Sequence, residues 1–252
     1  MPLRDHFHPP LSDFCPWSSF HGNWATKMVD RLNGDRLSEK YTAQSGRHFG
    51  AQIGADVATL ERTPRGSLFE DVNGSGGGVA TTATVYSPPA AELFASVEFD
   101  DPDLFEVKIY RGSGGWELVA AVELVSEANK DRGESRRTFA VKCGSYLQKG
   151  IALVVVDTVT THAADLHDEL CDLIEGTDAL RWTSPSGLSV VVYRATRTTG
   201  ATGPALKLDV YPFPVGIGQP LPTVPLWLGR DLAVPLELEL TYTRARESLR
   251  IS

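Results

Sequence analysis

Apolar side chains recur at intervals of three and four residues in the segment from Trp17 to Tyr41. Phe20, Trp24 and Leu32 carry this spacing, which is typical of the buried face of an amphipathic helix. The pair Asn33-Gly34 then supplies a helix-stop signal. The pattern therefore predicts one long helix near the N-terminus.

Two later segments have the same helical spacing. Arg136 to Gln148 places its apolar residues on one helical face, with Ser135 as a candidate N-cap and Gly150 just past the end. Ala163 to Ile174 also has the pattern of a helix. We expect both segments to pack an apolar face against a sheet.

Strand patterns occupy much of the remaining chain. Ile151 to Val156 is a continuous aliphatic run, typical of a strand buried on both faces. Leu104 to Tyr110 and Trp116 to Ser126 flank a glycine-rich connection and are predicted to pair as an antiparallel hairpin. Further strands are predicted at Gln52–Leu60, Leu188–Ala195, Leu206–Phe213 and Leu236–Tyr242, with an extended wrapping segment through Pro212, Pro214, Pro220, Pro222 and Pro225.

The order of hairpin, helix and buried strand forms a β-β-α-β unit. A long crossover through a helix brings the last strand parallel to a neighbour, so we expect an α/β fold with a mixed sheet and flanking helices. No linker divides the chain into independently patterned halves, which favours a single domain over residues 1–252. A segment rich in glycine, proline and serine at about residues 61–90 is expected to be a mobile insertion.

Composition restricts the classes of function. The formal charge of -8 argues against binding nucleic acid by bulk electrostatics, so any such contact must be local. The basic clusters are Arg132, Arg136 and Arg137, and Arg244, Arg246 and Arg250, and for both we favour solvated helix faces. The chain is expected to be cytoplasmic and without a membrane segment, because its three cysteines form no metal or disulfide pattern and no long apolar run occurs. Its oligomeric state is left open.

The run Ala121 to Val125 contains the most informative residue, Glu123, in an otherwise apolar strand that breaks at Asn129-Lys130. Period-two geometry places Glu117, Val119, Ala121, Glu123 and Val125 on one face and Trp116, Leu118, Val122 and Leu124 on the other. A buried carboxylate is costly unless a cation or hydrogen-bond donors meet it. If Asp56 pointed to the same side from an adjacent strand, Mg²⁺ or Mn²⁺ between the two would relieve their repulsion.

These residues also carry a resemblance to a known family. The carriers are Phe20-His21 with Trp24, Ala55-Asp56-Val57, Val122 to Ser126 with Asn129-Lys130, the helix from Lys142 to Tyr146 running into Gly150 and Asp157, and the proline-rich C-terminal part. With these the sequence resembles the bacterial domain-of-unknown-function family 4058, whose members look related to the Uma-type branch of the PD-(D/E)XK nuclease superfamily. The resemblance covers most of the chain.

The resemblance implies a PD-(D/E)XK core and a magnesium-dependent phosphodiesterase. Asp56 and Glu123 match the two metal carboxylates of that superfamily, but Val125 stands where its lysine is expected. Lys142, four residues before Tyr146, resembles in position an element that supplies the lysine in some branches, and Lys130 is the other candidate.

Each of these residues also has a structural interpretation. Glu123 could form an ion pair with Lys130 or Lys142, Tyr146 could fill the core, and Asp157 could cap a turn. The alternative function is then a non-catalytic binding or regulatory module on the same scaffold. A small-molecule hydrolase that uses the same carboxylates is a third hypothesis.

Overall fold

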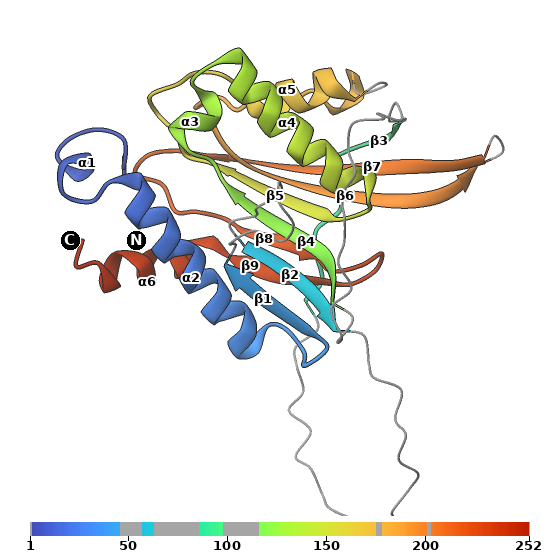
Figure 1. Cartoon of the computed structure of the whole chain (residues 1–252), viewed down its shortest axis with the longest axis horizontal. Coiled ribbons are helices and arrows are strands. Elements are labelled where there is room, and N and C mark those ends of the chain that lie inside the picture. Colours follow the sequence, from blue (N-terminus) through green and yellow to red (C-terminus); the bar gives the residue numbers. More distant parts are fainter. Residues whose placement is uncertain are drawn as a thin grey trace, which may run out of the picture.

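The chain forms a large mixed β-sheet with helices on both faces and a small second sheet (Figure 1). The computed structural model describes residues 2–45, 57–62, 86–97, 116–174, 178–200 and 203–251. The large sheet has seven strands in the order β1-β2-β4-β5-β6-β7-β3, and the small sheet pairs β8 with β9. The α/β class with a mixed sheet is thereby confirmed.

The bounds of the strands are β1 (Tyr41–Ser45), β2 (Val57–Arg62), β3 (Leu93–Val97), β4 (Trp116–Leu124), β5 (Ala152–Asp157), β6 (Leu188–Gly200), β7 (Gly203–Val215), β8 (Thr223–Trp227) and β9 (Ala233–Glu237). β4 and β5 run parallel, as predicted from the helical crossover between them, while the other paired strands in the described residues run antiparallel. The crossover therefore brings the carboxyl ends of β4 and β5 to the same edge of the sheet.

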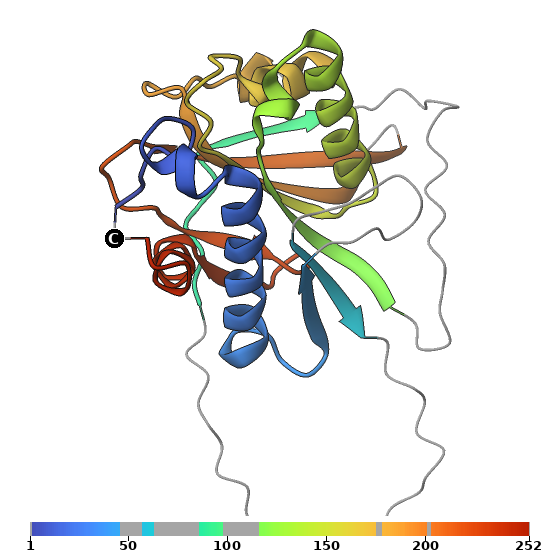
Figure 2. The ribbon, with the colours of Figure 1, turned by 60° about the vertical axis from the view of Figure 1, so that its left-hand side comes forward.

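The helices are α1 (Leu11–Phe14), α2 (Trp17–Asp35), α3 (Glu127–Lys130), α4 (Gly133–Gln148), α5 (Leu166–Leu173) and α6 (Leu238–Ser248). In Figures 1 and 2, α4 and α5 lie over one face of the sheet, whereas α2, α6 and the β8–β9 pair lie on the other side. The described helices include none that is long and apolar enough to cross a membrane.

A hydrophobic core fills each side of the sheet. The α2-side core joins residues such as Phe20, Trp24, Val122, Val154 and Tyr242. The α4-side core joins others, such as Ala121, Val125, Cys143, Val155 and Leu170. Alternate residues of β4 and β5 thus belong to different cores, which explains why both strands are mainly apolar.

The alternation along β4 breaks at Val119. Ala120 lies opposite Thr59 of β2, but Leu118 lies opposite the next residue, Leu60, so that Val119 is an extra residue in the ladder. An extra residue of this kind moves the side chains that precede it to the opposite face of the sheet. Leu118 accordingly packs against the α4-side core, and the prediction that it shares a face with Val122 and Leu124 is wrong.

The ends of the predicted helices differ slightly from the observed ones. α2 ends at Asp35, and the side chain of Asn33 donates to the carbonyl of Ala43 and accepts from its N–H, at 2.9 and 2.8 Å. Ser135 is not the N-cap of α4, because this helix begins at Gly133. Gly150 does follow the helix with φ of 79°, a conformation that favours glycine.

The predicted strand at Leu236–Tyr242 is wrong beyond Glu237. β9 ends there and α6 follows at once. The alternating apolar residues Leu236, Leu238 and Leu240 suggested a strand, but Leu238, Tyr242 and Ala245 are buried at the spacing of a helix. The two-residue period of a strand and the three- to four-residue period of a helix both fit this short segment. Packing of α6 against α2 favours the helix.

The proline-rich segment is also more regular than predicted, because three of its five prolines sit within strands. Pro212 and Pro214 belong to β7, and Pro225 belongs to β8. β3 pairs with β7 only from Leu206 to Val210, so the later part of β7 has a single neighbour, β6. A proline without an N–H is tolerated where one side of the strand is an edge.

Three predictions fall on parts of the chain outside the described residues. These are the first part of the strand at Gln52–Leu60, most of the insertion at 61–90, and the strand at Leu104–Tyr110. The predicted hairpin between Leu104–Tyr110 and Trp116–Ser126 therefore stays a prediction, and β4 pairs with β2 and β5.

α2 and β9 are joined by an ion-pair cluster at Glu237. Arg31 Nε donates to Glu237 Oε2 at 2.6 Å, and Arg36 Nη2 donates to Oε1 at 3.0 Å. The hydrogen bond from Arg31, with help from Arg36, lowers the pKa of Glu237 from 4.5 to about 2. Its carboxylate therefore stabilises the fold fully above pH 4.5, and this stabilisation is lost as the pH falls toward 2.

We expect Glu237→Gln to lower the free energy of unfolding by about 2 kcal/mol at pH 7, after allowance for solvent screening. The difference from wild type should shrink between pH 4.5 and 2, because the wild-type carboxyl group becomes protonated there. Urea unfolding at a series of pH values measures this difference. Glu247→Gln, at an exposed position of α6, is the control, and an equal loss in both variants would contradict the assignment.

Candidate functional site

Glu123 lies near the carboxyl end of β4 and faces the α4-side core. It is opposite Val155 of parallel β5, and its neighbour Val122 is opposite Val57 of β2. Ala121 and Val125, two residues to either side, belong to the α4-side core, which fixes the face on which Glu123 stands. Asp56, the other carboxylate expected here, precedes Val57 in the sequence and lies outside the described residues.

The cation that meets Glu123 is Lys142. From α4, Lys142 Nζ donates to Glu123 Oε2 at 2.8 Å. The Glu123 side chain is only 4% exposed, while that of Lys142 is 26% exposed. Lys142 is thus the more exposed partner of the pair, and it contacts a carboxylate that is almost fully buried.

Cys143 lies close enough to this ion pair for both charges to affect the pKa of its thiol. It is a free, buried cysteine next to Lys142 on α4. Burial raises the pKa of its thiol well above the usual value, and the negative charge of Glu123 raises it further, while Lys142 acts in the opposite sense. The thiol is therefore protonated at neutral pH, which argues against a nucleophilic role.

Tyr146 lies one helical turn after Lys142 and is buried in the α4-side core. Its ring packs in the apolar layer between α4 and the sheet, which is the structural interpretation of this residue. The structure thus brings Lys142 into contact with Glu123 and places Tyr146 in the α4-side core.

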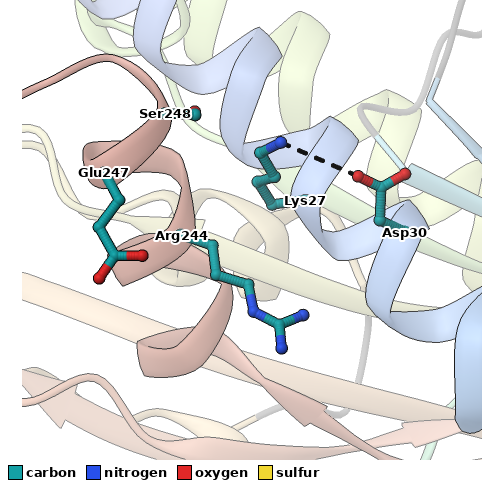
Figure 3. Close-up of a pocket in the computed structure, with 5 residues that line it drawn as sticks. All are labelled: Lys27, Asp30, Arg244, Glu247 and Ser248. Atoms are coloured by element: carbon teal, nitrogen blue, oxygen red, sulfur yellow. Dashed lines mark ion pairs between the residues drawn. The ribbon is translucent and has the colours of Figure 1, made fainter.

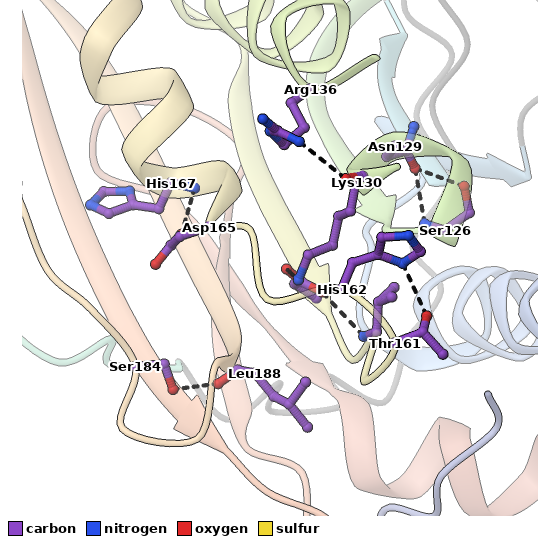
Figure 4. A network of polar contacts seen from close by, with 12 residues as sticks. Ser126, Asn129, Lys130, Arg136, Thr161, His162, Asp165, His167, Ser184 and Leu188 are labelled. Atoms are coloured by element: carbon purple, nitrogen blue, oxygen red, sulfur yellow. Dashed lines mark hydrogen bonds and ion pairs between the residues drawn. The ribbon is translucent and has the colours of Figure 1, made fainter. Parts of the chain in front are cut away.

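Lys130, the second candidate lysine, has another partner. The chain leaves β4 through Ser126, whose N–H donates to Asn129 Oδ1 at 2.9 Å and starts the short helix α3. From the end of this helix, Lys130 Nζ donates to Asp157 Oδ2 at 2.8 Å (Figure 4). The side chains are 0% and 6% exposed, so this pair is more deeply buried than the Glu123–Lys142 pair.

Asp157 also supports the turn after β5, as the structural interpretation expected. Its Oδ1 accepts from the N–H of Val159 at 3.1 Å. Burial raises the pKa of Asp157, and the charge and hydrogen bond of Lys130 only partly offset this effect. The ion pair therefore compensates for desolvation and does not by itself add a large stabilisation.

Sequence reasoning left both lysines open for Glu123 and did not pair Lys130 with Asp157. A usable signal existed, since Lys130 follows β4 and Asp157 ends β5. Residues at the carboxyl ends of adjacent parallel strands lie at the same edge of a sheet. Nearby, Thr161 Oγ1 donates to Glu127 Oε1 at 2.6 Å. The same oxygen lies 3.1 Å from Nδ1 of His162 (Figure 4).

The prediction of solvated helix faces holds for most but not all members of the two basic clusters. Arg246 is buried, so the prediction that it belongs to a solvated helix face is wrong. Arg132 and Arg136 are paired with Asp131 and Glu169, at 3.1 and 2.7 Å. Such pairing reduces the positive charge that this surface presents to a phosphate.

The described residues do not fit a divalent metal ion well. They contain no group of three or more His, Cys, Asp or Glu side chains placed to hold one. At Glu123 a metal would also have to displace the ammonium of Lys142 from a carboxylate that water barely reaches. Mg²⁺ retains several waters and needs oxygen ligands, and a dry carboxylate with a cation at 2.8 Å offers neither room nor negative charge.

A pocket lies elsewhere, between α2 and α6. It is lined by Lys27, Asp30, Arg244, Glu247 and Ser248 (Figure 3). Lys27 and Asp30 form a loose surface contact at 4.0 Å. Charges of both signs line this pocket, and neither Glu123 nor Lys142 is among its residues, so it is separate from the site predicted from the sequence.

Comparison of the chain with protein-family models, with curated proteins and with solved structures finds no match. The interpretation of the site therefore depends on its own geometry.

We expect Lys130→Met to lower the free energy of unfolding by about 3 kcal/mol, because Asp157 would be left buried without its cation. The double variant Lys130→Met/Asp157→Asn should recover much of this loss, since Asn can still accept from the N–H of Val159. Chemical denaturation of the two single variants and the double variant gives the coupling. The control is Arg132→Met, which breaks an exposed pair and should cost about 0.5 kcal/mol or less. Strictly additive losses at Lys130 and Asp157 would refute the pairing.

Proposed function

We propose that this chain is a non-catalytic PD-(D/E)XK-like module that works by binding a partner, and that Glu123 serves its fold. The observation that supports this proposal is the contact of Glu123 Oε2 with Lys142 Nζ at 2.8 Å, on a carboxylate that is 4% exposed. A group that acts on a substrate must be reachable by that substrate. Here the carboxylate is almost fully buried, and its Oε2 accepts a hydrogen bond from the ammonium of Lys142.

The energetic cost of burying a charge also supports a structural role for Glu123. Isolated charges in a protein interior cost several kcal/mol each, and a close ion pair offsets that cost without exceeding it by much. Glu123 stands among Ala121, Val125 and Cys143, which supply no other charge. Lys142 thus supplies a compensating charge for Glu123 on this strand, and its ammonium is engaged in this contact.

The charge of the molecule supports a protein partner over nucleic acid. The formal charge is -8, and Arg132 and Arg136 are already paired with carboxylates. Net negative charge and the pairing of these two arginines both disfavour binding of phosphate groups by bulk electrostatics. Local contact with nucleic acid remains part of the rival hypothesis.

The rival is the magnesium-dependent phosphodiesterase that the family resemblance implies. One observation favours it: of the two candidate lysines, Lys142 contacts Glu123, as expected if it replaces the lysine missing at Val125. In this hypothesis Asp56 and Glu123 hold Mg²⁺ or Mn²⁺, which would supply the activation of water. A measurement of metal binding therefore distinguishes the non-catalytic module from the phosphodiesterase.

Isothermal titration of the wild-type chain with Mg²⁺ and with Mn²⁺ should give no saturable heat, because the carboxylate of Glu123 is neutralised by Lys142. Under the same conditions Glu123→Ala should behave like wild type. A saturable heat in wild type that disappears in Glu123→Ala, together with cleavage of DNA, RNA or a small phosphodiester, would overturn the proposal in favour of the hydrolase.

A structural ion pair also predicts a specific pattern of stabilities. Lys142→Met should lower the free energy of unfolding by about 3 kcal/mol, since it strands a buried charge, whereas Glu123→Leu/Lys142→Met should restore most of it. The matched control is Lys27→Met, which removes a lysine of similar exposure whose carboxylate contact is 4.0 Å long. Equal stability of Lys142→Met and wild type would contradict the structural role.

A further inference from the structure

His6 is enclosed by aromatic rings from two helices. Its ring centroid lies 3.9 Å from that of Phe20 and 5.7 Å from those of Trp17 and Tyr242. Only 2% of His6 is exposed. The segment before α1 thus inserts a polar side chain between the start of α2 and the middle of α6.

The hydrogen bonds around His6 determine which ring nitrogen carries a proton. The N–H of Arg4 donates to the hydroxyl oxygen of Tyr242 at 2.9 Å, and this oxygen lies 2.8 Å from Nε2 of His6. Nε2 is the acceptor available to the buried Tyr242 hydroxyl hydrogen within the described residues. Neutral His6 therefore carries its hydrogen on Nδ1, and Nδ1 has no hydrogen-bond partner among the residues that the structure describes.

Arg246 brings a full positive charge to the same region. It lies one turn after Tyr242 on α6 and is 1% exposed. Its guanidinium donates from Nη2 to the carbonyl of Ile251 at 3.3 Å and lies 6.0 Å from the centre of the Tyr242 ring. Within the described ranges Nε has no acceptor, and no carboxylate forms an ion pair with this side chain.

Trp17 adds a third donor. Its ring is buried beside His6, and its Nε1–H has no acceptor within the described part of the chain. Trp17 is also the first residue of α2, a helix of 19 residues, so the positive end of the helix dipole lies here as well.

The electrostatics around His6 agree with an excess of positive charge. The charged groups that act on it are Arg246 from α6 and Arg4 and Asp5 from its own segment. Burial, followed by the charge of Arg246, lowers the pKa of His6 to about 4. Asp5 opposes this effect, but its carboxylate accepts from Thr160 at 2.7 Å and from the N–H of Phe7 at 3.0 Å.

We propose that His6, Trp17 and Arg246 form a buried site for one small monovalent anion of halide size, which supplies the missing counter-charge of Arg246. A guanidinium is protonated at any ordinary pH, so its burial without an anion would cost several kcal/mol. The unpartnered polar atoms at this place are all N–H donors, which select an anion over a metal cation. The aromatic enclosure limits the ligand to a small one. This site is independent of Glu123 and of the proposed function.

Chloride is the probe for a first test. At constant ionic strength, replacing sodium gluconate by sodium chloride should raise the Tm of the full chain by about 5 °C at saturation. Arg246→Met should abolish the response. Arg244→Met removes an exposed arginine two residues away on α6 and should retain it. If Arg246→Met does not fold, Trp17→Phe, which keeps a ring but loses the donor, should weaken the chloride response about tenfold in midpoint concentration.

Bromide locates the anion directly. Crystals of the full chain grown in sodium bromide should give an anomalous peak within hydrogen-bond distance of Arg246 Nε, with Trp17 Nε1 or His6 Nδ1 as a further contact. A water molecule at that position, with no anomalous signal, would overturn the proposal. So would a chloride response of equal size in wild type and Arg246→Met.

Discussion

The parallel pairing of β4 and β5 creates the constraint on which the rest of this structure depends. Each strand is apolar and each carries one carboxylate that water barely reaches, Glu123 and Asp157. In the part of the chain that the structure describes, lysines from the crossover between the two strands contact both carboxylates. α3 brings Lys130 to Asp157 and α4 brings Lys142 to Glu123. The crossover therefore connects the two strands and also supplies a lysine to each buried carboxylate. These contacts offset the cost of burying the two charges.

This requirement explains why the crossover is tightly packed. α3 starts directly at the end of β4 through Ser126 and Asn129, so Lys130 has little freedom of position. α4 approaches α5 closely at Gly144, where an added Cβ would stand 3.2 Å from Leu173 Cδ2. A larger residue at this position, two residues after Lys142, would require the Leu173 side chain to move. Packing between the helices and pairing of the charges thus support each other.

The sequence predicted those parts of the fold that depend on local periodicity. The long helix α2, the buried strand β5 and its parallel neighbour, and the glycine after α4 follow from spacing and turn chemistry. It failed where two periods fit equally, as at Leu236 to Tyr242, and where one extra residue changed the ladder, as at Val119. At the site, the charge of Glu123 in an apolar strand predicted a cation as its partner, but it did not identify which lysine supplies that cation. Lys130 and Lys142 differ only in where their helices run, which is a tertiary property. Arg246 could not be recognised as buried, because polar residues surround it in the sequence.

The same physics limits what the family resemblance can say about activity. In a nuclease of that type the carboxylate on the strand and a nearby lysine act on a substrate, but in this fold the same two residues are also needed to bury β4 under α4. A strand carboxylate that requires a lysine keeps that lysine whether or not anything is cleaved. The match of Glu123 and Lys142 to a catalytic pattern therefore has more weight for the architecture than for the reaction. Accessibility bears on the choice between the two cases: a catalytic carboxylate must be reached by water and substrate, whereas the Glu123 side chain is 4% exposed and contacts Lys142, which is why we propose a structural role for it.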